Sequence, residues 1–317
     1  MVFISFIVLN LILALLYITY CKLTYGINKC SRHLVGKVVI VTGSNNGIGY
    51  ETAKDLAERG ARVILACRNN LRGTKARDQI IAESGNHDVH YRQLDLASFH
   101  SVRRFAEEFI KTEKRLDILI NNAGVLDVDN VKTENGLFVG MQANHFGPFL
   151  LTNLLLPLIK SSAPSRIINV TSIAYSKGII DFNNLNLEKE TPQSYSKIQA
   201  YKNSKLCNVL MTTELARLLE GTGVTANCLH PGFVNTNILN FDKLPFSKYW
   251  LPITSCFVKT PWEGAQTSIY LAVSPEVENV TGCYFADCQV KILTETGRNT
   301  ELARSLWEES EKIIAKK

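Results

Sequence analysis

The residues of this chain with the clearest chemical potential are Tyr201 and Lys205, in the stretch Ala-Tyr-Lys-Asn-Ser-Lys. A spacing of four residues places a phenol and an ammonium on one face of a helix. A phenol with its free pKa of about 10 is a poor proton donor or base at neutral pH, and a neighbouring cation favours the phenolate. We therefore expect Lys205 to lower the pKa of Tyr201 and make it a general acid or base. The spacing also occurs by chance in many helices, so the pair needs support from the rest of the chain.

A glycine-rich turn lies upstream of this pair. The apolar, β-branched run 37–41 predicts a buried strand, the segment 51–59 predicts a helix, and 62–66 predicts a second strand. Glycines in the first crossover of such a βαβ unit let the backbone approach a pyrophosphate at the positive end of the helix. The glycine spacing is G-x-x-x-G-x-G. The turn predicted to bind a dinucleotide consists of Gly43, Ser44, Asn45, Asn46, Gly47, Ile48 and Gly49.

The end of the second predicted strand indicates which dinucleotide binds. A carboxylate at this point holds the ribose 2′-hydroxyl of NAD, but no Asp or Glu lies between Arg59 and Asp78. Arg68 is available instead, and a guanidinium suits a 2′-phosphate through charge-assisted hydrogen bonds. The sequence therefore favours NADP(H) over NAD(H).

The elements that must position these residues alternate between strand and helix. This alternation predicts an α/β fold, a doubly wound parallel sheet of the Rossmann type, in a single domain. The motifs follow the carboxyl ends of the predicted strands, where open α/β sheets bind ligands. A long helix at about 198–220 carries Tyr201 and Lys205, and 299–317 predicts an amphipathic surface helix. Strands are expected near 38–42, 62–66, 89–94, 116–120, 166–170, 224–229 and 283–286.

Taken together, these motifs resemble those of the short-chain dehydrogenase/reductases over roughly residues 36–310. Within that family the chain looks most like the membrane-anchored retinol dehydrogenases, on the stretches 66–69, 144–149, 169–172 and 282–288. The motifs that carry the family resemblance, in order, are Thr42–Gly49, Asn121-Asn122-Ala123-Gly124, Asn144, Ser172, Tyr201 with Lys205, and Pro231-Gly232.

The resemblance implies catalytic roles. Tyr201 would be the general acid in carbonyl reduction and the base in the reverse direction, and Lys205 would also hold the nicotinamide ribose. Ser172 would hydrogen-bond the substrate oxygen as charge develops on it. Asn144 would help to hold a water in a proton path to Lys205. Further positions implied for the cofactor site are Asp95 and Leu96 near the adenine, Asn122, Ala123 and Gly124 on its floor, and Pro231, Gly232 and Thr236 at the nicotinamide.

The N-terminus indicates where the protein works. Residues 1–21 contain no charged residue and no histidine. As a helix, this segment is long enough to cross a hydrocarbon core of about 30 Å. A cleaved secretory signal would show a basic start and a small-x-small cleavage site, and neither is present. The basic flank that follows predicts a cytosolic catalytic domain. We expect a transmembrane signal anchor at 1–21, a basic juxtamembrane linker at 22–36 and a catalytic domain at 37–317, on the endoplasmic reticulum.

Composition argues against nucleic acid and metal ions as partners of this chain. The net charge of +6 is scattered or explained by the flank behind the anchor, and no stripe predicts nucleic-acid binding. The eight cysteines lack metal or disulfide spacing, so we expect reduced thiols and no metal site. A homodimer is a further expectation from the resemblance.

The substrate must be inferred from the aromatic segment 237–262, which forms a substrate lid in the family. An apolar lid suits a lipophilic alcohol and its aldehyde or ketone, and could touch the bilayer. The resemblance makes retinol and retinal the first candidates, with steroids and lipid aldehydes as alternatives. A different class also stays open, a non-catalytic membrane-tethered NADPH sensor, although such a protein has no need for all four catalytic residues.

Overall fold

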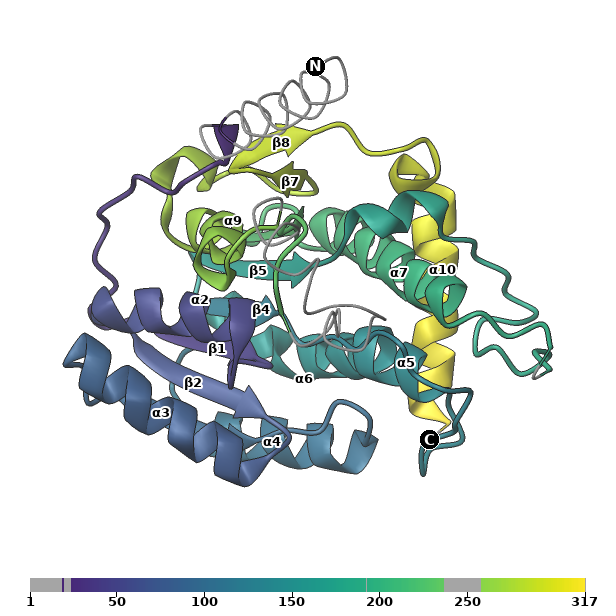
Figure 1. Ribbon diagram of the computed structural model, residues 1–317, viewed down its shortest axis with the longest axis horizontal. Helices are drawn as coiled ribbons and strands as arrows, with labels where there is room; N and C mark the ends of the chain where they lie inside the picture. Colours follow the sequence, from purple (N-terminus) through teal and green to yellow (C-terminus); the bar gives the residue numbers. More distant parts are fainter. Residues whose placement is uncertain (1–18, 20–23, 192, 237–257, 317) are drawn as a thin grey trace, which may run out of the picture.

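The structure, a computed structural model, describes residues 19, 24–191, 193–236 and 258–316 (Figure 1). Its centre is an eight-stranded sheet with the order β3-β2-β1-β4-β5-β6-β7-β8. The pairs from β3 to β7 are parallel, and β8 pairs with β7 antiparallel. The strands are β1 (Val38–Thr42), β2 (Arg62–Cys67), β3 (Val89–Gln93), β4 (Ile118–Asn121), β5 (Ser165–Val170), β6 (Val224–His230), β7 (Tyr284–Ala286) and β8 (Gln289–Lys291).

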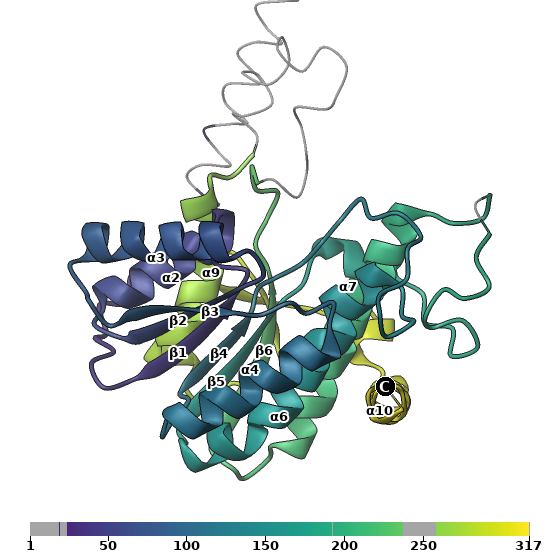
Figure 2. The same cartoon turned by 90° about the horizontal axis from the view of Figure 1, so that it is seen from below.

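Helices cover both faces of this sheet (Figure 2). On one face lie α2 (Gly47–Glu58), α3 (Asn70–Ser84) and α9 (Pro261–Val273). On the other lie α4 (Phe99–Thr112), α6 (Gly147–Ser161), α7 (Lys197–Leu218) and α10 (Thr300–Ala315). Shorter helical segments are α5 (Val139–Met141), the π-helical η1 (Gln142–Phe146), and the 3-10 turns η2 (Ile173–Lys177), η5 (Pro275–Val277) and η6 (Thr296–Arg298).

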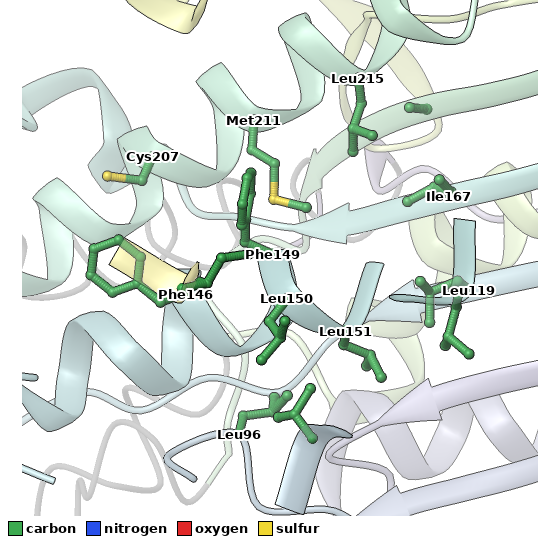
Figure 3. Close-up of a cluster of buried hydrophobic side chains, with 14 of the residues drawn as sticks. Leu96, Leu119, Phe146, Phe149, Leu150, Leu151, Ile167, Cys207, Met211 and Leu215 are labelled. Atoms are coloured by element: carbon green, nitrogen blue, oxygen red, sulfur yellow. The ribbon is translucent and has the colours of Figure 1, made fainter. Parts of the chain in front are cut away.

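Two apolar cores result from the alternation of side chains along the strands. In β1, Val39 and Val41 face α2, α3 and α9, while Val38 and Ile40 face the opposite layer. All of these side chains are buried, as continuous β-branched runs in a parallel sheet require. Figure 3 shows the second core, in which phenylalanine and leucine side chains of α6 pack between α7 and strands β4 and β5.

The strand order reverses direction at β1, which lies between β2 and β4. At such a point the loops after neighbouring strands diverge and leave room for a ligand at the carboxyl edge. The predicted α/β fold with a parallel, doubly wound sheet is therefore confirmed, and the predicted strand positions agree with the observed ones to within two residues. Strand β8 was missed, because Gln289–Lys291 is short and exposed and shows no apolar pattern.

The first helix begins earlier than predicted. Helix α2 starts at Gly47, inside the glycine turn, whereas the sequence pattern places its start at 51. Glycine has a low helix propensity, so propensity alone hides a helical turn that begins with Gly-Ile-Gly. The earlier start points the first backbone N–H groups of α2 into the loop after β1.

The segment 24–36, predicted to belong to a linker, packs on the domain. The backbone N–H of Asn28 donates to Oε1 of Gln266 on α9 at 3.1 Å, and Leu34 is buried beside α2. No helix in the described part of the chain is both long and apolar enough to cross a bilayer. The predicted anchor at 1–21 and most of the predicted lid, 237–257, lie outside the described residues.

Candidate active site

The glycine turn after β1 is packed against the loop after β4. Gly43 has a φ of +66°, and a Cβ at this position would lie 2.8 Å from the Cα of Ala123. A Cβ on Gly49 would lie 2.4 Å from Nδ2 of Asn122, which itself donates to the carbonyl of Thr42 at 2.8 Å. Only glycine allows this approach, so the two loops form one continuous floor.

A cavity of about 580 Å³ lies on this floor at the carboxyl edge of the sheet. It runs from the end of β2 to Tyr201 and Lys205 on helix α7. Most of the predicted cofactor residues line it, which the sequence could not establish from spacing alone. They are Gly43, Asn45, Asn46, Gly47, Ile48, Gly49, Arg68, Asp95, Leu96, Asn122, Ala123, Gly124, Tyr201, Lys205, Pro231 and Thr236.

Two predicted cofactor residues lie behind the cavity wall instead. Ser44 is fully buried, and its hydroxyl donates to the carbonyl of Val41 at 2.8 Å, so its side chain does not face the cavity. Gly232 lies beside Pro231 but packs against the stem of Lys259. Both residues shape the site through the backbone. The motif alone does not say which of its residues face the cavity, because that depends on how the loops pack.

The end of the cavity at β2 is cationic. Arg68, at the end of β2, lines it together with Asn69 and Arg72, which the sequence analysis missed. Asn69 caps α3 by accepting a hydrogen bond from the backbone N–H of Arg72 at 2.9 Å, so this N-terminus is fixed at the cavity. The signal available in the sequence was the spacing of Arg68 and Arg72, which brings both guanidinium groups to one helix start.

Asp95 lines the adjacent part of the cavity. Its carboxylate accepts a hydrogen bond from the backbone N–H of Ala97 at 2.9 Å, which holds the loop after β3 in a tight turn. Asp95 therefore lies at the cavity, as predicted, and it also stabilises the loop that carries it.

The opposite end of the cavity contains Tyr201 and Lys205, on α7. The Nζ of Lys205 lies 5.5 Å from the centroid of the Tyr201 ring and donates to the carbonyl of Val170 at 3.0 Å. Lys205 is buried, and burial lowers its pKa to about 8 because the ammonium has lost its water. A buried ammonium next to a cavity has donors left for hydroxyl groups of a ligand.

The expected lowering of the Tyr201 pKa by Lys205 is not observed. Burial raises the pKa of Tyr201, and a hydrogen bond with the side chain of Ser172 acts in the opposite direction. The physical reason is that the apolar surroundings penalise a phenolate as they penalise the Lys205 ammonium. Ser172, two residues beyond the end of β5, lies close enough to Tyr201 to influence the pKa of its phenol.

Asn144 lies in the π-helical segment η1 and is buried. Its Nδ2 donates to the carbonyl of Val125 at 2.9 Å and to Oγ of Ser204 at 3.0 Å, and its Oδ1 accepts from the N–H of Val125 at 2.7 Å. A Cβ on Gly124 would lie 3.2 Å from the Nζ of Lys205 and 3.6 Å from Oδ1 of Asn144. The structure therefore brings Asn144 and Lys205 together beside one glycine.

Residues 125–128 of the loop after β4 form a further wall beside Tyr201 and were not among the predicted site residues. Nζ of Lys197 lies 3.1 Å from Oδ1 of Asp127 and 2.7 Å from Oδ1 of Asp129, and the hydroxyl of Tyr195 donates to the carbonyl of Val128 at 2.7 Å. These bonds tie the loop to the start of α7. A small pocket between them is lined by Val125, Leu126, Val128, Phe138, Tyr195 and Tyr201, among others.

His145 is a packed residue. It is fully buried and its Nε2 lies 2.9 Å from Oγ of Ser310 on α10. Burial lowers its pKa to about 4, so the ring is neutral at physiological pH.

The residues of the cavity fit a dinucleotide. Glycines allow a phosphate to approach the start of α2, Arg68 and Arg72 lie at one end, and a phenol and an ammonium lie at the other. With the parallel sheet, this arrangement defines a Rossmann-type dinucleotide-binding oxidoreductase.

The sequence comparisons place the chain more narrowly. Residues 37–184 match the family described as short chain dehydrogenase. Human retinol dehydrogenase 14 is 48% identical over 294 residues, which cover 88% of this chain and 86% of that protein. Mouse retinol dehydrogenase 11 is 47% identical over 289 residues, covering 91% of this chain and 89% of that protein. The chain belongs to the short-chain dehydrogenase/reductase family, and it is similar to the retinol dehydrogenases within it.

Solved structures agree with this assignment. An uncharacterised protein of Mycobacterium paratuberculosis superposes with a TM-score of 0.73 at 31% identity, covering 90% of this chain and 95% of that one. The NADP complex of Pseudomonas aeruginosa RhlG superposes with a TM-score of 0.64 at 27% identity, covering 80% of this chain and 95% of that one.

Proposed function

We propose that this protein is an NADP(H)-dependent oxidoreductase that interconverts a lipophilic alcohol, in the first place retinol, and its carbonyl form. The observation that carries the proposal is that a single cavity has Arg68 and Arg72 at one end and Tyr201 with Lys205 at the other. The cationic end suits a 2′-phosphate, and the other end suits proton transfer to a carbonyl oxygen. The retinol dehydrogenase names of similar proteins support retinol as the first substrate to test.

The chemistry divides between cofactor and protein. A bound nicotinamide would supply or accept the hydride, and the protein supplies orientation, a proton and charge stabilisation. In carbonyl reduction, the Tyr201 hydroxyl donates its proton to the substrate oxygen, and the raised pKa keeps this hydroxyl protonated at neutral pH. Ser172 donates a hydrogen bond to the same oxygen as negative charge develops there. Lys205 would hold ribose hydroxyls of the bound cofactor, and Asn144 fixes the loop at Val125 beside it.

We further propose that residues 1–21 anchor the enzyme in the endoplasmic reticulum membrane with the catalytic domain on the cytosolic side. The uncharged apolar run and the basic residues after it support this placement. A lipophilic substrate dissolved in the same membrane would then be close to the site.

The experiment that tests the function is NADPH oxidation with all-trans-retinal, using membranes that contain the wild type or Tyr201→Phe, with NADH in parallel. We expect turnover with NADPH, weaker turnover with NADH, and a loss of about a hundredfold or more in the variant while NADPH still binds. Tyr270→Phe is the matched control, because Tyr270 lies on α9 and hydrogen-bonds Glu276 away from the cavity.

Other outcomes separate the alternatives. If NADPH binds but retinal is not reduced, the substrate assignment is wrong, and steroids and lipid aldehydes are tested next. If Tyr201→Phe behaves as wild type in both binding and cellular function, and no carbonyl substrate turns over, a non-catalytic sensor explains the chain better.

A further inference from the structure

An ion pair between a buried lysine and a partly exposed aspartate lies directly behind the turn that follows β6. Nζ of Lys259 and Oδ1 of Asp287 are 2.5 Å apart, and the Lys259 side chain is only 5% exposed. Lysine is seldom buried, because removing an ammonium from water costs free energy that only close partners offset. The proposed chemistry uses neither residue, so the pair requires another explanation.

Lys259 is in direct contact with the turn. Gly232 has a φ of +95°, and a Cβ there would lie 2.8 Å from Cδ and 2.9 Å from Cε of Lys259. The backbone of Lys259 also donates to the carbonyl of Phe233 at 2.7 Å and accepts from the N–H of Asn235 at 2.9 Å. Lys259 thus holds the stretch between Pro231 and Thr236 from behind, while both of these residues line the cavity.

Lys259 is itself fixed by the helix that follows it. Thr260 and Glu263 form a reciprocal capping box at the start of α9. Farther along that helix, a Cβ on Gly264 would lie 2.6 Å from Cγ2 of Val234 and 3.2 Å from Cγ1 of Ile48. Helix α9 therefore packs simultaneously on the turn after β6 and on the glycine turn, and the position of Lys259 is set relative to both.

Asp287 is fixed from the other side by the N-terminal segment. Asp287 and Cys288 form the turn between β7 and β8 with φ values of 52° and 57°, an unfavourable region for these residues. The N–H of Gly26 donates to Oδ1 of Asp287 at 3.4 Å, and Nζ of Lys259 lies 4.6 Å from the centroid of the Tyr25 ring. A cation over an aromatic face is stabilised further when it is desolvated.

We propose that Lys259, Asp287 and Tyr25 are positioning residues that hold the turn from Pro231 to Thr236 in place for the nicotinamide half of the cofactor. Strand β6 lies beside β5, whose end carries Ser172, so this turn borders the catalytic end of the cavity. It follows that the segment after the N-terminal apolar run is part of the cofactor site's support rather than a tether. This inference rests on the proposed dinucleotide function.

The test measures the Kd of NADPH and of NADH by calorimetry for full-length wild type, Lys259→Met, Asp287→Asn and Tyr25→Leu. We expect the Kd of both cofactors to rise about tenfold or more and by the same factor, because the turn is remote from the 2′-phosphate. Arg68→Ala, in contrast, is expected to weaken NADPH alone. Tyr25→Phe keeps the ring under the ammonium and is expected to bind both cofactors nearly as wild type does.

Lys37→Met is the matched control for a purely structural effect. Nζ of Lys37 and Oδ1 of Asp117 lie 2.9 Å apart at the amino ends of β1 and β4, at the sheet edge opposite the cavity. Its loss should lower thermal stability without changing either Kd. If Lys259→Met fails to fold, the double variant Lys259→Met/Asp287→Leu removes both charges and leaves none buried without a partner.

The outcomes are separable. Wild-type affinity for both cofactors in the folded variants, Tyr25→Leu included, would overturn the positioning role while leaving the proposed function intact. A wild type that binds neither cofactor would overturn the proposed function and this inference with it. A loss confined to NADPH would also contradict the inference, since it would place the effect at the 2′-phosphate.

Discussion

The proposed preference for NADP(H) rests on two side chains, Arg68 and Arg72. Both guanidinium groups line the cavity at the start of α3, and the chain has no acidic residue between Arg59 and Asp78 that could hold a free ribose 2′-hydroxyl. A guanidinium binds a phosphate through planar, charge-assisted hydrogen bonds, whereas it gains little from a hydroxyl. Discrimination at this end of the cavity should therefore be electrostatic.

We predict that Arg68→Ala raises the Kd of NADPH by about ten- to a hundredfold, which corresponds to the loss of hydrogen bonds to a charged group. The Kd of NADH should change by less than about threefold. Arg77→Ala is the control, because Arg77 lies on the same helix but pairs with Asp78. Calorimetric titration with both cofactors measures the effect, and an equal loss for both would contradict a 2′-phosphate contact.

Lys205 illustrates a conflict between stability and function at one residue. Its folded-state pKa of about 8 lies below the value of 10.5 for a free lysine, so folding disfavours the charged form. The folded protein therefore carries a penalty of about 3 kcal/mol that is fully present below pH 8, and it disappears as the pH rises from 8 through 10.5.

We predict that Lys205→Met abolishes turnover but increases the free energy of unfolding by about 1–3 kcal/mol at pH 7. The lower end of that range applies if the loss of the hydrogen bond to Val170 offsets part of the gain. The gain should be roughly halved at pH 9.5. At that pH the folded protein already holds Lys205 in its neutral form, so the wild type no longer carries the full cost of a buried ammonium. Urea denaturation at both pH values measures this, and a gain that grows with pH would contradict the assignment.

At the scale of elements, the site depends on how closely the loops at the carboxyl edge approach one another. The glycine turn after β1, the loop after β4 and the turn after β6 meet at contacts that exclude even a methyl group. The π-helical segment η1 adds a local widening that points Asn144 at the loop after β4. These contacts hold the cavity floor rigid.

We predict that Gly43→Ala lowers stability by about 2–4 kcal/mol and weakens NADPH binding. Its left-handed conformation costs about 1–2 kcal/mol for alanine, and its new Cβ would collide with the backbone of Ala123. Gly85→Ala is the control, since Gly85 has a φ of +69° but no atom within 4 Å of a new Cβ. It should show the conformational cost alone, with unchanged NADPH affinity. Equal effects of the two substitutions on cofactor affinity would contradict the packing argument.

At the scale of the whole molecule, the N-terminal segment joins the domain before β1 begins. Cys30, Leu34 and Asn28 contact α9 or α2, and Nη1 of Arg59 donates to the carbonyl of Cys30 at 2.8 Å. The folded unit thus extends upstream of the predicted boundary at residue 37. The segment from 24 onward buries apolar surface and satisfies hydrogen bonds that the domain otherwise lacks.

We predict that a chain starting at Thr24 keeps the thermal midpoint of the catalytic domain, whereas a chain starting at Lys37 melts at least about 5 °C lower. The second truncation removes buried Leu34, worth about 1.5–3 kcal/mol, together with the hydrogen bonds above. Scanning calorimetry of the two proteins measures the difference. Identical midpoints would indicate that the segment is only a linker.

The sequence by itself determined the sheet and named the candidate catalytic side chains. Continuous β-branched runs such as 38–42 must be buried on both faces, and their alternation with helices predicts a parallel sheet. The candidate catalytic residues follow from spacing along single elements and from the resemblance, because each motif is short and contiguous. What a motif does not encode is the direction in which a side chain points.

Only the tertiary structure decided which motif residues face the cavity and what their surroundings do to them. The Ser44 hydroxyl faces the core, Lys259 packs against Gly232, and the Tyr201 pKa is raised rather than lowered, since burial arises from elements far apart in the chain. Arg72 and the Lys259–Asp287 pair join the site for the same reason. Desolvation and close packing are properties of three-dimensional neighbours, so they enter only when the strands and helices have assembled.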